Sequence, residues 1–231
     1  MRVINCKVES IEAQTAIVHK VVLLPEFPLE FIAGQYLQVV MGEKDKRPFS
    51  IASAPSSPNK IELHIGADPA NKYAFEVLTK CQTEGSLIVE APLGEAFLRK
   101  SHLPAIIVAG GTGYSYAKSI VLDCLESQPD REVKLYWGAK TINDLYEYSA
   151  LEAMSLTHPN FTFFPVVEHP NDDWLGHTGW VHKAAIRDIT DFSGKQVYAA
   201  GRFEMSATIR AEFCSIGLNK TELFGDAYAF I

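Results

Sequence analysis

Ala105-Ile106-Ile107-Val108-Ala109-Gly110-Gly111-Thr112-Gly113 decides the fold of the second half of this 231-residue chain. The five apolar residues at its start are typical of a strand that is buried on both faces of a parallel sheet. Glycines follow at once, and a helical pattern then begins, marked by Ala117, Ile120, Val121, Cys124 and Leu125. A strand, a glycine turn and a helix in this order predict a βαβ unit of an α/β sheet.

The glycine turn also suits a phosphate group. Glycines let backbone N–H groups come close to a pyrophosphate, and the helix N-terminus adds positive potential. The motif departs from the full dinucleotide fingerprint, because Tyr116 stands where a third glycine is expected. A tight turn that holds no ligand is the alternative. We assign nucleotide binding to a set that runs through the turn into the helix: Gly110, Gly111, Thr112, Gly113, Tyr114 and Ser115.

Strands and helices continue to alternate as far as the C-terminus. Strands are predicted at residues 133–137, 161–167 and 196–200, helices at 145–156, 180–189 and 205–214, and a terminal segment at 223–231. This alternation predicts a doubly wound parallel sheet.

The carboxyl ends of these strands carry further candidates, because ligands of open parallel sheets gather there. Gly201, Arg202 and Phe203 repeat the strand–turn–helix arrangement at the fourth strand, so we assign them to the nucleotide. A solvated cation explains Arg202 equally well. Lys140 and Tyr146 follow the second strand and are candidates for a phosphate and for a ribose or adenine, with core packing or capping as the alternative.

The first half of the chain has a shorter apolar period. Six strands are predicted, at residues 3–10, 17–24, 35–41, 49–52, 61–65 and 87–91, with one helix on which Tyr73, Val77 and Cys81 share a face. Short strands between turn signals favour a small antiparallel barrel or sandwich. Pro92, Gly94 and Pro104 punctuate the chain where the pattern changes. We therefore expect two domains, residues 1–98 and 99–231.

Arg47-Pro48-Phe49-Ser50 predicts a second binding site, in the first half. It brings together a cation, a rigid turn at the proline, a flat aromatic ring and a hydroxyl. These groups suit a flat, hydrogen-bonding ligand with a polar or charged tail. Together with the glycine turn, this stretch favours two ring systems held face to face.

Composition excludes several other classes. The net charge of −7 and the absence of a basic cluster argue against nucleic-acid binding. The four cysteines lie far apart without a CxxC, and the seven histidines show no metal spacing, so we expect free thiols and no metal site. No signal peptide is visible, and no apolar run approaches the ~18–20 residues that span a membrane. We expect a cytoplasmic protein that does not enter a membrane.

The order of these motifs resembles the ferredoxin–NADP reductase superfamily, and within it the bacterial NAD(P)H:flavin oxidoreductases, which include flavin reductases that serve luciferase. The resemblance is carried by five stretches in order: Arg47 to Ser50, Gly110 to Gly113, Tyr136-Trp137-Gly138, Asp144-Leu145-Tyr146 and Ala200 to Met205. It implies an N-terminal flavin-binding Greek-key β-barrel, a C-terminal NAD(P)H-binding domain and an active site between them.

The resemblance also implies roles for single residues. Arg47 steadies the ribityl-phosphate side of the flavin, Phe49 packs on its rings, and Ser50 lies near its central ring nitrogen. Asp226 helps to seat the nicotinamide, and an aromatic beyond it, Tyr228 or Phe230, lies near the flavin. The flavin-binding set is completed by Pro48, His64, Ile65 and Tyr73.

The chain departs from the superfamily pattern at three places. Phe49 replaces a tyrosine, Ala200-Gly201-Arg202 replaces Cys-Gly-Pro, and Asp226 replaces a glutamate. The short chain offers no obvious loop to hold an adenine, which is consistent with riboflavin, FMN or FAD as an exchanging substrate.

The resemblance implies that NADH or NADPH donates a hydride to the flavin, which the protein accelerates by stacking the two rings. Ser50 and Asp226 are the catalytic candidates. Glu168 favours NADH, whereas Lys140 and Arg202 tolerate NADPH, so we expect both to be used.

Two other functions remain open at the level of sequence. One is an FAD-containing electron-transfer component for a ferredoxin or an oxygenase, and the other is a non-catalytic subunit that binds flavin and nucleotide. For the flavin reductase, the resemblance leaves the recipient of the reduced flavin open: a flavin-dependent enzyme such as luciferase or a monooxygenase, ferric iron, or a redox-activated enzyme.

Overall fold

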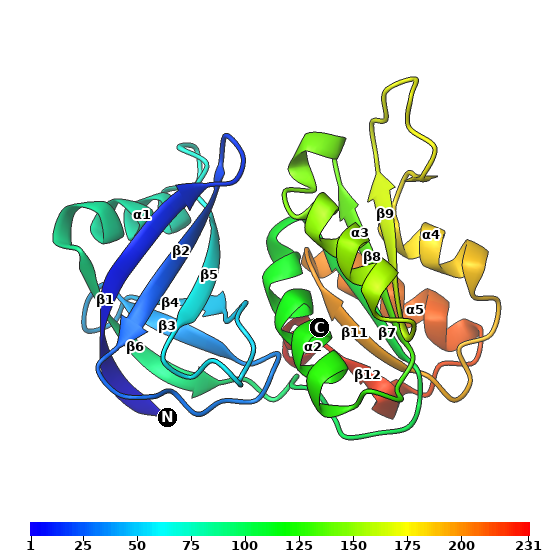
Figure 1. Ribbon diagram of the computed structural model, residues 1–231, viewed down its shortest axis with the longest axis horizontal. Coiled ribbons are helices and arrows are strands. Elements are labelled where there is room, and N and C mark those ends of the chain that lie inside the picture. The colour runs from blue at the N-terminus through cyan, green and yellow to red at the C-terminus, as the bar shows by residue number, and fades with distance from the viewer.

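The computed structural model describes all 231 residues and places two sheets side by side (Figure 1). The first sheet is built by the N-terminal part of the chain, coloured blue to teal, and the second by the part coloured green to red. We call the first, β1 to β6, the barrel domain and the second, β7 to β12, the second domain. None of the helices combines the length and apolar character needed to cross a bilayer.

The barrel domain is antiparallel throughout, with strand order β4-β3-β6-β1-β2-β5. The amide of Ala52, just after β4, donates to the carbonyl of Glu62 in β5 at 2.8 Å, which brings the two ends of the sheet together. This confirms the Greek-key barrel. Its elements are β1 Arg2–Ala13, β2 Val18–Pro25, β3 Tyr36–Val40, β4 Lys46–Ser50, β5 Ile61–Gly66, α1 Lys72–Glu84 and β6 Ser86–Leu93.

Alternation along the strands explains the core of the barrel. In β5, Ile61, Leu63 and Ile65 are fully buried among the apolar residues of the neighbouring strands. The helix α1 closes one end with its apolar face, where Val77 and Cys81 join the same core. The residues of β5 that alternate with this set point out of the barrel, toward the second domain.

One element of the barrel differs from its prediction. The strand predicted at 49–52 begins earlier, at Lys46, and ends at Ser50. The turn predicted at Pro48 is therefore wrong, because Pro48 lies in β4 and pairs with Gln38 of β3. A proline is tolerated there because β4 stands at one end of the sheet order and pairs with β3 alone. The N–H that proline lacks is therefore not needed by a strand on the other side of β4.

The second domain is a six-stranded parallel sheet of order β10-β9-β8-β7-β11-β12. Helices α2 and α3 pack on one face around Ile107 and Leu135, and α4 and α5 on the other around Ile106 and Val108 (Figure 1). The doubly wound sheet is confirmed. Its elements are β7 Ala105–Gly110, α2 Tyr114–Ser127, β8 Val133–Ala139, α3 Tyr148–Thr157, β9 Phe161–Val167, β10 His177–Thr178, α4 Val181–Asp188, β11 Gln196–Ala200, α5 Phe203–Ser215 and β12 Leu223–Phe224.

The helix predicted from residue 145 starts three residues later. Thr141 and Asp144 form a capping box on a short 3₁₀ turn, Ile142–Asp144, and α3 begins only at Tyr148. The apolar Leu145 is buried, which explains why it extended the helical pattern. The two-residue strands β10 and β12 were not predicted, because two residues show no period.

The predicted boundary between residues 98 and 99 lies in the connection from β6 to β7. The amide of Leu98 donates to Ala33 of the barrel domain at 2.8 Å. The next amide, of Arg99, donates to the hydroxyl of Tyr198 in the second domain at 3.0 Å. The boundary itself stays a prediction, which this change of partner supports.

Candidate active site

The glycine turn lies at the carboxyl end of β7, directly beside the end of β11. A Cβ added to Gly113 would lie 2.3 Å from the carbonyl oxygen of Ala200, so this close approach requires glycine. Gly111 has a φ of +54° with open space around its Cα, and α2 starts immediately after the turn. The two predicted nucleotide turns therefore meet at one edge of the sheet, as ligand binding at that edge requires.

The side chain of Ser115, in the first turn of α2, is buried and its hydroxyl has no hydrogen-bond partner. An unpaired buried hydroxyl next to an open glycine turn fits the binding of a phosphate there. Thr112 and Gly111 are exposed, as are Lys140, Arg202 and Glu168 near the ends of β8, β11 and β9. The structure thus gathers these candidates at one edge, and their contacts with a nucleotide stay predictions.

Arg47 lies in β4 with almost all of its donors in use. Its Nε and Nη2 donate to the carboxylate of Asp45 at 2.9 and 2.6 Å, and Nη2 also donates to Glu76 at 2.7 Å. Nη1 donates to the carbonyl of Tyr73 at 2.6 Å, and the guanidinium lies 4.9 Å from the centre of the Tyr73 ring. Arg47 and Tyr73 are therefore together, but the positive charge of Arg47 is already met by two carboxylates.

Ser50 ends β4 and pairs across the ladder with Tyr36 of β3. The ring of Tyr36 lies against Gly94, where an added Cβ would be 2.8 Å from it. The same Gly94 faces Asp226, whose Oδ1 is 3.3 Å from that added Cβ. Ser50 and Asp226, the two catalytic candidates, are thus linked across the domain contact. Ser50 pairs with Tyr36, and both Tyr36 and Asp226 lie beside Gly94.

Asp226 carries a perturbed carboxyl group. Burial raises its pKa from 3.8 to about 6, because no cation lies close enough to oppose the loss of water. Burial also raises the pKa of Tyr36, with the charge of Asp226 as a second cause. A carboxyl group with a pKa near neutrality at the contact between two domains is typical of an active site.

The two C-terminal aromatics occupy different surroundings. Tyr228 packs on the core of the second domain, and its hydroxyl donates to the carbonyl of Ser206 at 3.1 Å. Phe230 is 78% exposed and meets the half-exposed Phe203 edge to face, with ring centres 6.2 Å apart. Only Phe230 is therefore open to a ligand without the loss of an existing contact.

The remaining flavin candidates differ in what they offer. Pro48 is exposed, and Phe49 packs on the edge of the barrel core. The side chain of Ile65 points into that core, so only its backbone faces outward. The next residue, Gly66, meets Thr112 of the glycine turn, with an added Cβ 3.2 Å from its Cγ2. The end of β5 therefore touches the nucleotide turn directly.

The ring of His64 is fully buried at the contact between the domains. Its Nε2 lies 2.7 Å from Glu62 and its Nδ1 lies 3.0 Å from the hydroxyl of Tyr146. Tyr114 stacks on Trp137 with ring centres 3.9 Å apart and lies 5.8 Å from His64. The side chains of His64, Tyr114 and Tyr146 thus hold the two domains together, and their predicted ligand contacts remain untested.

Three charged residues at this contact were not predicted as functional: Glu62, Lys118 and Glu147. Lys118 in α2 donates to Glu62 in β5 at 2.7 Å and to Glu147 before α3 at 2.6 Å. The signal available in the sequence was Glu62 and His64 on the polar side of an alternating strand, which is indistinguishable from a solvent-facing side. We call these three residues the seam cluster.

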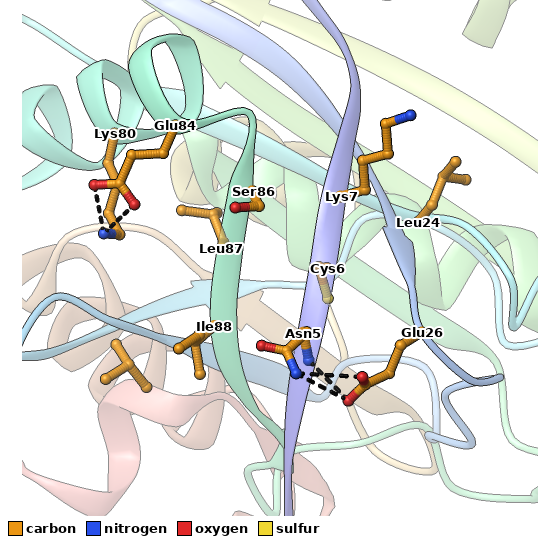
Figure 2. Close-up of a pocket in the computed structure, with 11 residues that line it drawn as sticks. Asn5, Cys6, Lys7, Leu24, Glu26, Lys80, Glu84, Ser86, Leu87 and Ile88 are labelled. Carbon is orange, nitrogen blue, oxygen red and sulfur yellow. Dashed lines mark hydrogen bonds and ion pairs between the residues drawn. The ribbon is translucent and has the colours of Figure 1, made fainter.

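A hollow of about 450 Å³ lies elsewhere, on the outer side of the barrel between β1, β6 and α1 (Figure 2). Its polar side chains bond one another, Asn5 with Glu26 and Lys80 with Glu84. The hollow lies at the start of β6 and against β1, which stands on the side of the barrel away from the second domain (Figure 1). This hollow therefore has no part in the candidate site.

Comparison with known proteins matches this architecture along the whole chain. An NAD(P)H-flavin reductase of Aliivibrio fischeri is 46% identical, and one of Vibrio harveyi is 43% identical; each alignment covers 99% of both chains. The chain belongs to the NAD(P)H-flavin reductase family. The oxidoreductase NAD-binding domain family also matches residues 107–211 of this flavin reductase, which hold the glycine turn.

Solved structures share the fold of this flavin reductase. A cytochrome P450 reductase of Amycolatopsis superposes with a TM-score of 0.90 at 25% identity and covers 97% of this chain, which spans 69% of that protein. A ferredoxin NADP⁺ reductase of Neisseria gonorrhoeae, with bound FAD and NADP, has a TM-score of 0.80 at 15% identity over 97% of this chain and 98% of its own. These superpositions confirm the predicted two-domain fold.

Proposed function

We propose that this flavin reductase transfers a hydride from NADH or NADPH to free flavin and releases the reduced flavin. The observation that carries the proposal is the contact between Gly66 and Thr112, because it brings β5, the strand with the flavin candidates His64 and Ile65, against the nucleotide turn. Relatives with the name NAD(P)H-flavin reductase match over nearly their full length, which supports the same reaction.

In the proposed mechanism the two bound molecules supply the redox chemistry, and the protein holds their rings in contact. Ser50 offers a hydroxyl beside the flavin ring and stabilises the charge that arrives there. Asp226 seats the nicotinamide from the opposite domain. Phe230, the exposed aromatic, is the one that we propose lies over the flavin, since Tyr228 is held in the core.

Riboflavin is the flavin that the surroundings of Arg47 favour. Asp45 and Glu76 outweigh the single charge of Arg47, so this end of the strand is anionic rather than cationic. A ribityl chain without phosphate avoids the repulsion that the phosphate of FMN would meet there. We propose that both are accepted and that riboflavin binds more tightly.

Neither alternative function is favoured. Two electron-transfer reductases among the structural neighbours are longer, and this chain spans 69% of each, but a ferredoxin NADP⁺ reductase is matched over 98% of its own length, so chain length does not separate the alternatives. The flavin reductases of Aliivibrio fischeri and Vibrio harveyi instead match it from end to end. The end-to-end match with relatives that are named NAD(P)H-flavin reductases therefore supports direct release of reduced flavin.

We propose that the reduced flavin is used by a separate flavin-dependent enzyme, such as a luciferase or a monooxygenase, in the cytoplasm. All four cysteines are free thiols, three of them buried, which fits a reducing compartment.

Steady-state oxidation of NADH by the purified chain, with and without added riboflavin, tests the proposed function. Oxidation that depends on free riboflavin, by a protein that is colourless after gel filtration, supports it. A yellow protein that reduces an added ferredoxin, but not free riboflavin, would favour the electron-transfer alternative. Binding of both ligands without turnover would favour the non-catalytic one.

A further inference from the structure

The seam cluster joins the two domains through one lysine. Lys118 Nζ lies 2.7 Å from Glu62 of the barrel domain and 2.6 Å from Glu147 of the second domain, and these side chains are only 16–20% exposed. The ligand atoms of Glu62, His64 and Glu147 lie within 4.8 Å of one another. The ammonium group therefore occupies the place that a bound cation would take among these groups.

The same network continues on both sides of Lys118. On the barrel side, His64 lies between Glu62 and the hydroxyl of Tyr146, at 2.7 and 3.0 Å. A proton on Nε2 of His64 satisfies both contacts. On the other side, Tyr114 donates to Glu147 at 2.7 Å. Burial acts to raise the pKa of Glu62, but the hydrogen bond from His64 and the charge and hydrogen bond of Lys118 lower it to about 2, so Glu62 is an anion.

The position of this cluster relates it to the two ligand sites. Glu62 and His64 lie on β5, and the same strand ends at Gly66 against Thr112 of the glycine turn. Lys118 lies on α2, the helix that begins directly after that turn. A change in the separation of the domains at Lys118 therefore moves the nucleotide turn relative to the flavin strands.

We propose that Lys118 is a positioning residue, which sets the distance between the nicotinamide and flavin sites by holding Glu62 and Glu147 together across the domain contact. This inference rests on the proposed function. Without the ammonium group, the carboxylates of Glu62 and Glu147 would remain close together across the domain contact, beside a hollow of about 450 Å³ that Lys20 also lines, and their repulsion would push the domains apart. The chemistry would lose alignment, although Lys118 contacts neither ligand.

Single-turnover reduction of riboflavin by NADH, followed by stopped flow at saturating ligands, tests the proposal. For Lys118→Met we expect the rate constant to fall about tenfold or more, since small misplacements cost about that much or more. Loss of folded protein alone would lower the amplitude of the trace and leave the rate constant unchanged. Lys118→Met combined with Glu147→Gln removes the repulsion and should recover most of the rate.

Lys80→Met is the matched control, because Lys80 also bonds a carboxylate at 2.7–2.8 Å, but within α1 of the barrel domain. Its rate constant should equal that of the wild type. Small-angle scattering gives a readout that needs no turnover: Lys118→Met should have a larger radius of gyration than the wild type, and the double variant should not.

The results separate this inference from the proposed function. A wild-type chain that does not reduce riboflavin would refute the function, and scattering would still decide the role of Lys118 in domain spacing. An active wild type with a Lys118→Met rate constant within about twofold of it would overturn the positioning role. Equal scattering of the two proteins would overturn it as well.

Discussion

Asp226→Asn is expected to stabilise the protein at neutral pH and to have little effect near pH 4. The pKa of Asp226 is raised by burial from 3.8 to about 6. Folding therefore favours the protonated form: the stability of the wild type is complete below pH 3.8 and declines as the pH rises through about 6. Asparagine has no proton to lose, so the variant does not share this decline.

The size of the effect follows from the two pKa values. A change from 3.8 to about 6 corresponds to about 3 kcal/mol, or about 2–3 kcal/mol once the remaining water contact of the carboxyl group is allowed for. For a chain of this length, that is a rise in Tm of about 4–12 °C at pH 7.5. At pH 5 the difference should be about half as large.

Thermal unfolding of the two proteins between pH 4.5 and 8 measures this difference, and the other titrating groups cancel in the comparison. Asp173→Asn is the control, since Asp173 is exposed in a loop. A stability difference between Asp226→Asn and the wild type that did not change with pH would refute the reasoning, as would a less stable variant at pH 7.5. The expected result would mean that stability is lost at this site for the sake of function.

Three further substitutions test the candidate site. Ser50→Ala should slow hydride transfer about tenfold or more and weaken flavin affinity less, with Ser56→Ala as an exposed control; equal rates in stopped flow would remove the proposed role of Ser50. Gly113→Ala places a Cβ 2.3 Å from a backbone oxygen, so NADH affinity measured by titration should fall at least about tenfold, whereas Gly42→Ala, with its nearest neighbour 4.0 Å away, should bind normally. Glu76→Gln frees part of the charge of Arg47, so the affinity for FMN should rise relative to riboflavin; an unchanged ratio would contradict an electrostatic origin of the preference.

The fold was predictable because apolar residues are spaced differently along the two halves of the sequence. The continuous apolar run at residues 105–109 gave a strand buried on both faces, and the alternation at 61–65 gave one with a single apolar face. A turn was wrongly predicted at Pro48 because a proline is unexpected in a strand unless that strand lies at the edge of its sheet. Whether a strand lies at the edge depends on the whole sheet and cannot be read from local sequence. The start of α3 was predicted three residues too early because a buried leucine next to a 3₁₀ turn, such as Leu145, fits the apolar pattern of a helix.

The candidate site was predictable to the extent that its chemistry is local in sequence. Glycines at 110, 111 and 113 follow a strand, and the close approach of Gly113 to Ala200 explains why a side chain is not accommodated there. The state of Arg47 was not predictable, because Asp45 is a neighbour in sequence but Glu76 reaches it from α1, 29 residues away. The same arginine can therefore serve as a phosphate-binding cation or as a neutralised one, and only the fold distinguishes them.

The seam cluster could not be predicted from the sequence, because its members come from distant parts of the chain. Alternation along β5 indicates that Glu62 and His64 point out of the barrel, but it cannot tell water from a second domain. The cation that meets Glu62 comes from 56 residues away, and no motif includes it. A buried carboxylate needs such a partner, since burial alone would raise its pKa as it does for Asp226. The contrast between Glu62, with a pKa of about 2, and Asp226, with one of about 6, therefore separates a carboxylate that is paired with a cation across the domain contact from one that has no such cation and that we propose seats the nicotinamide.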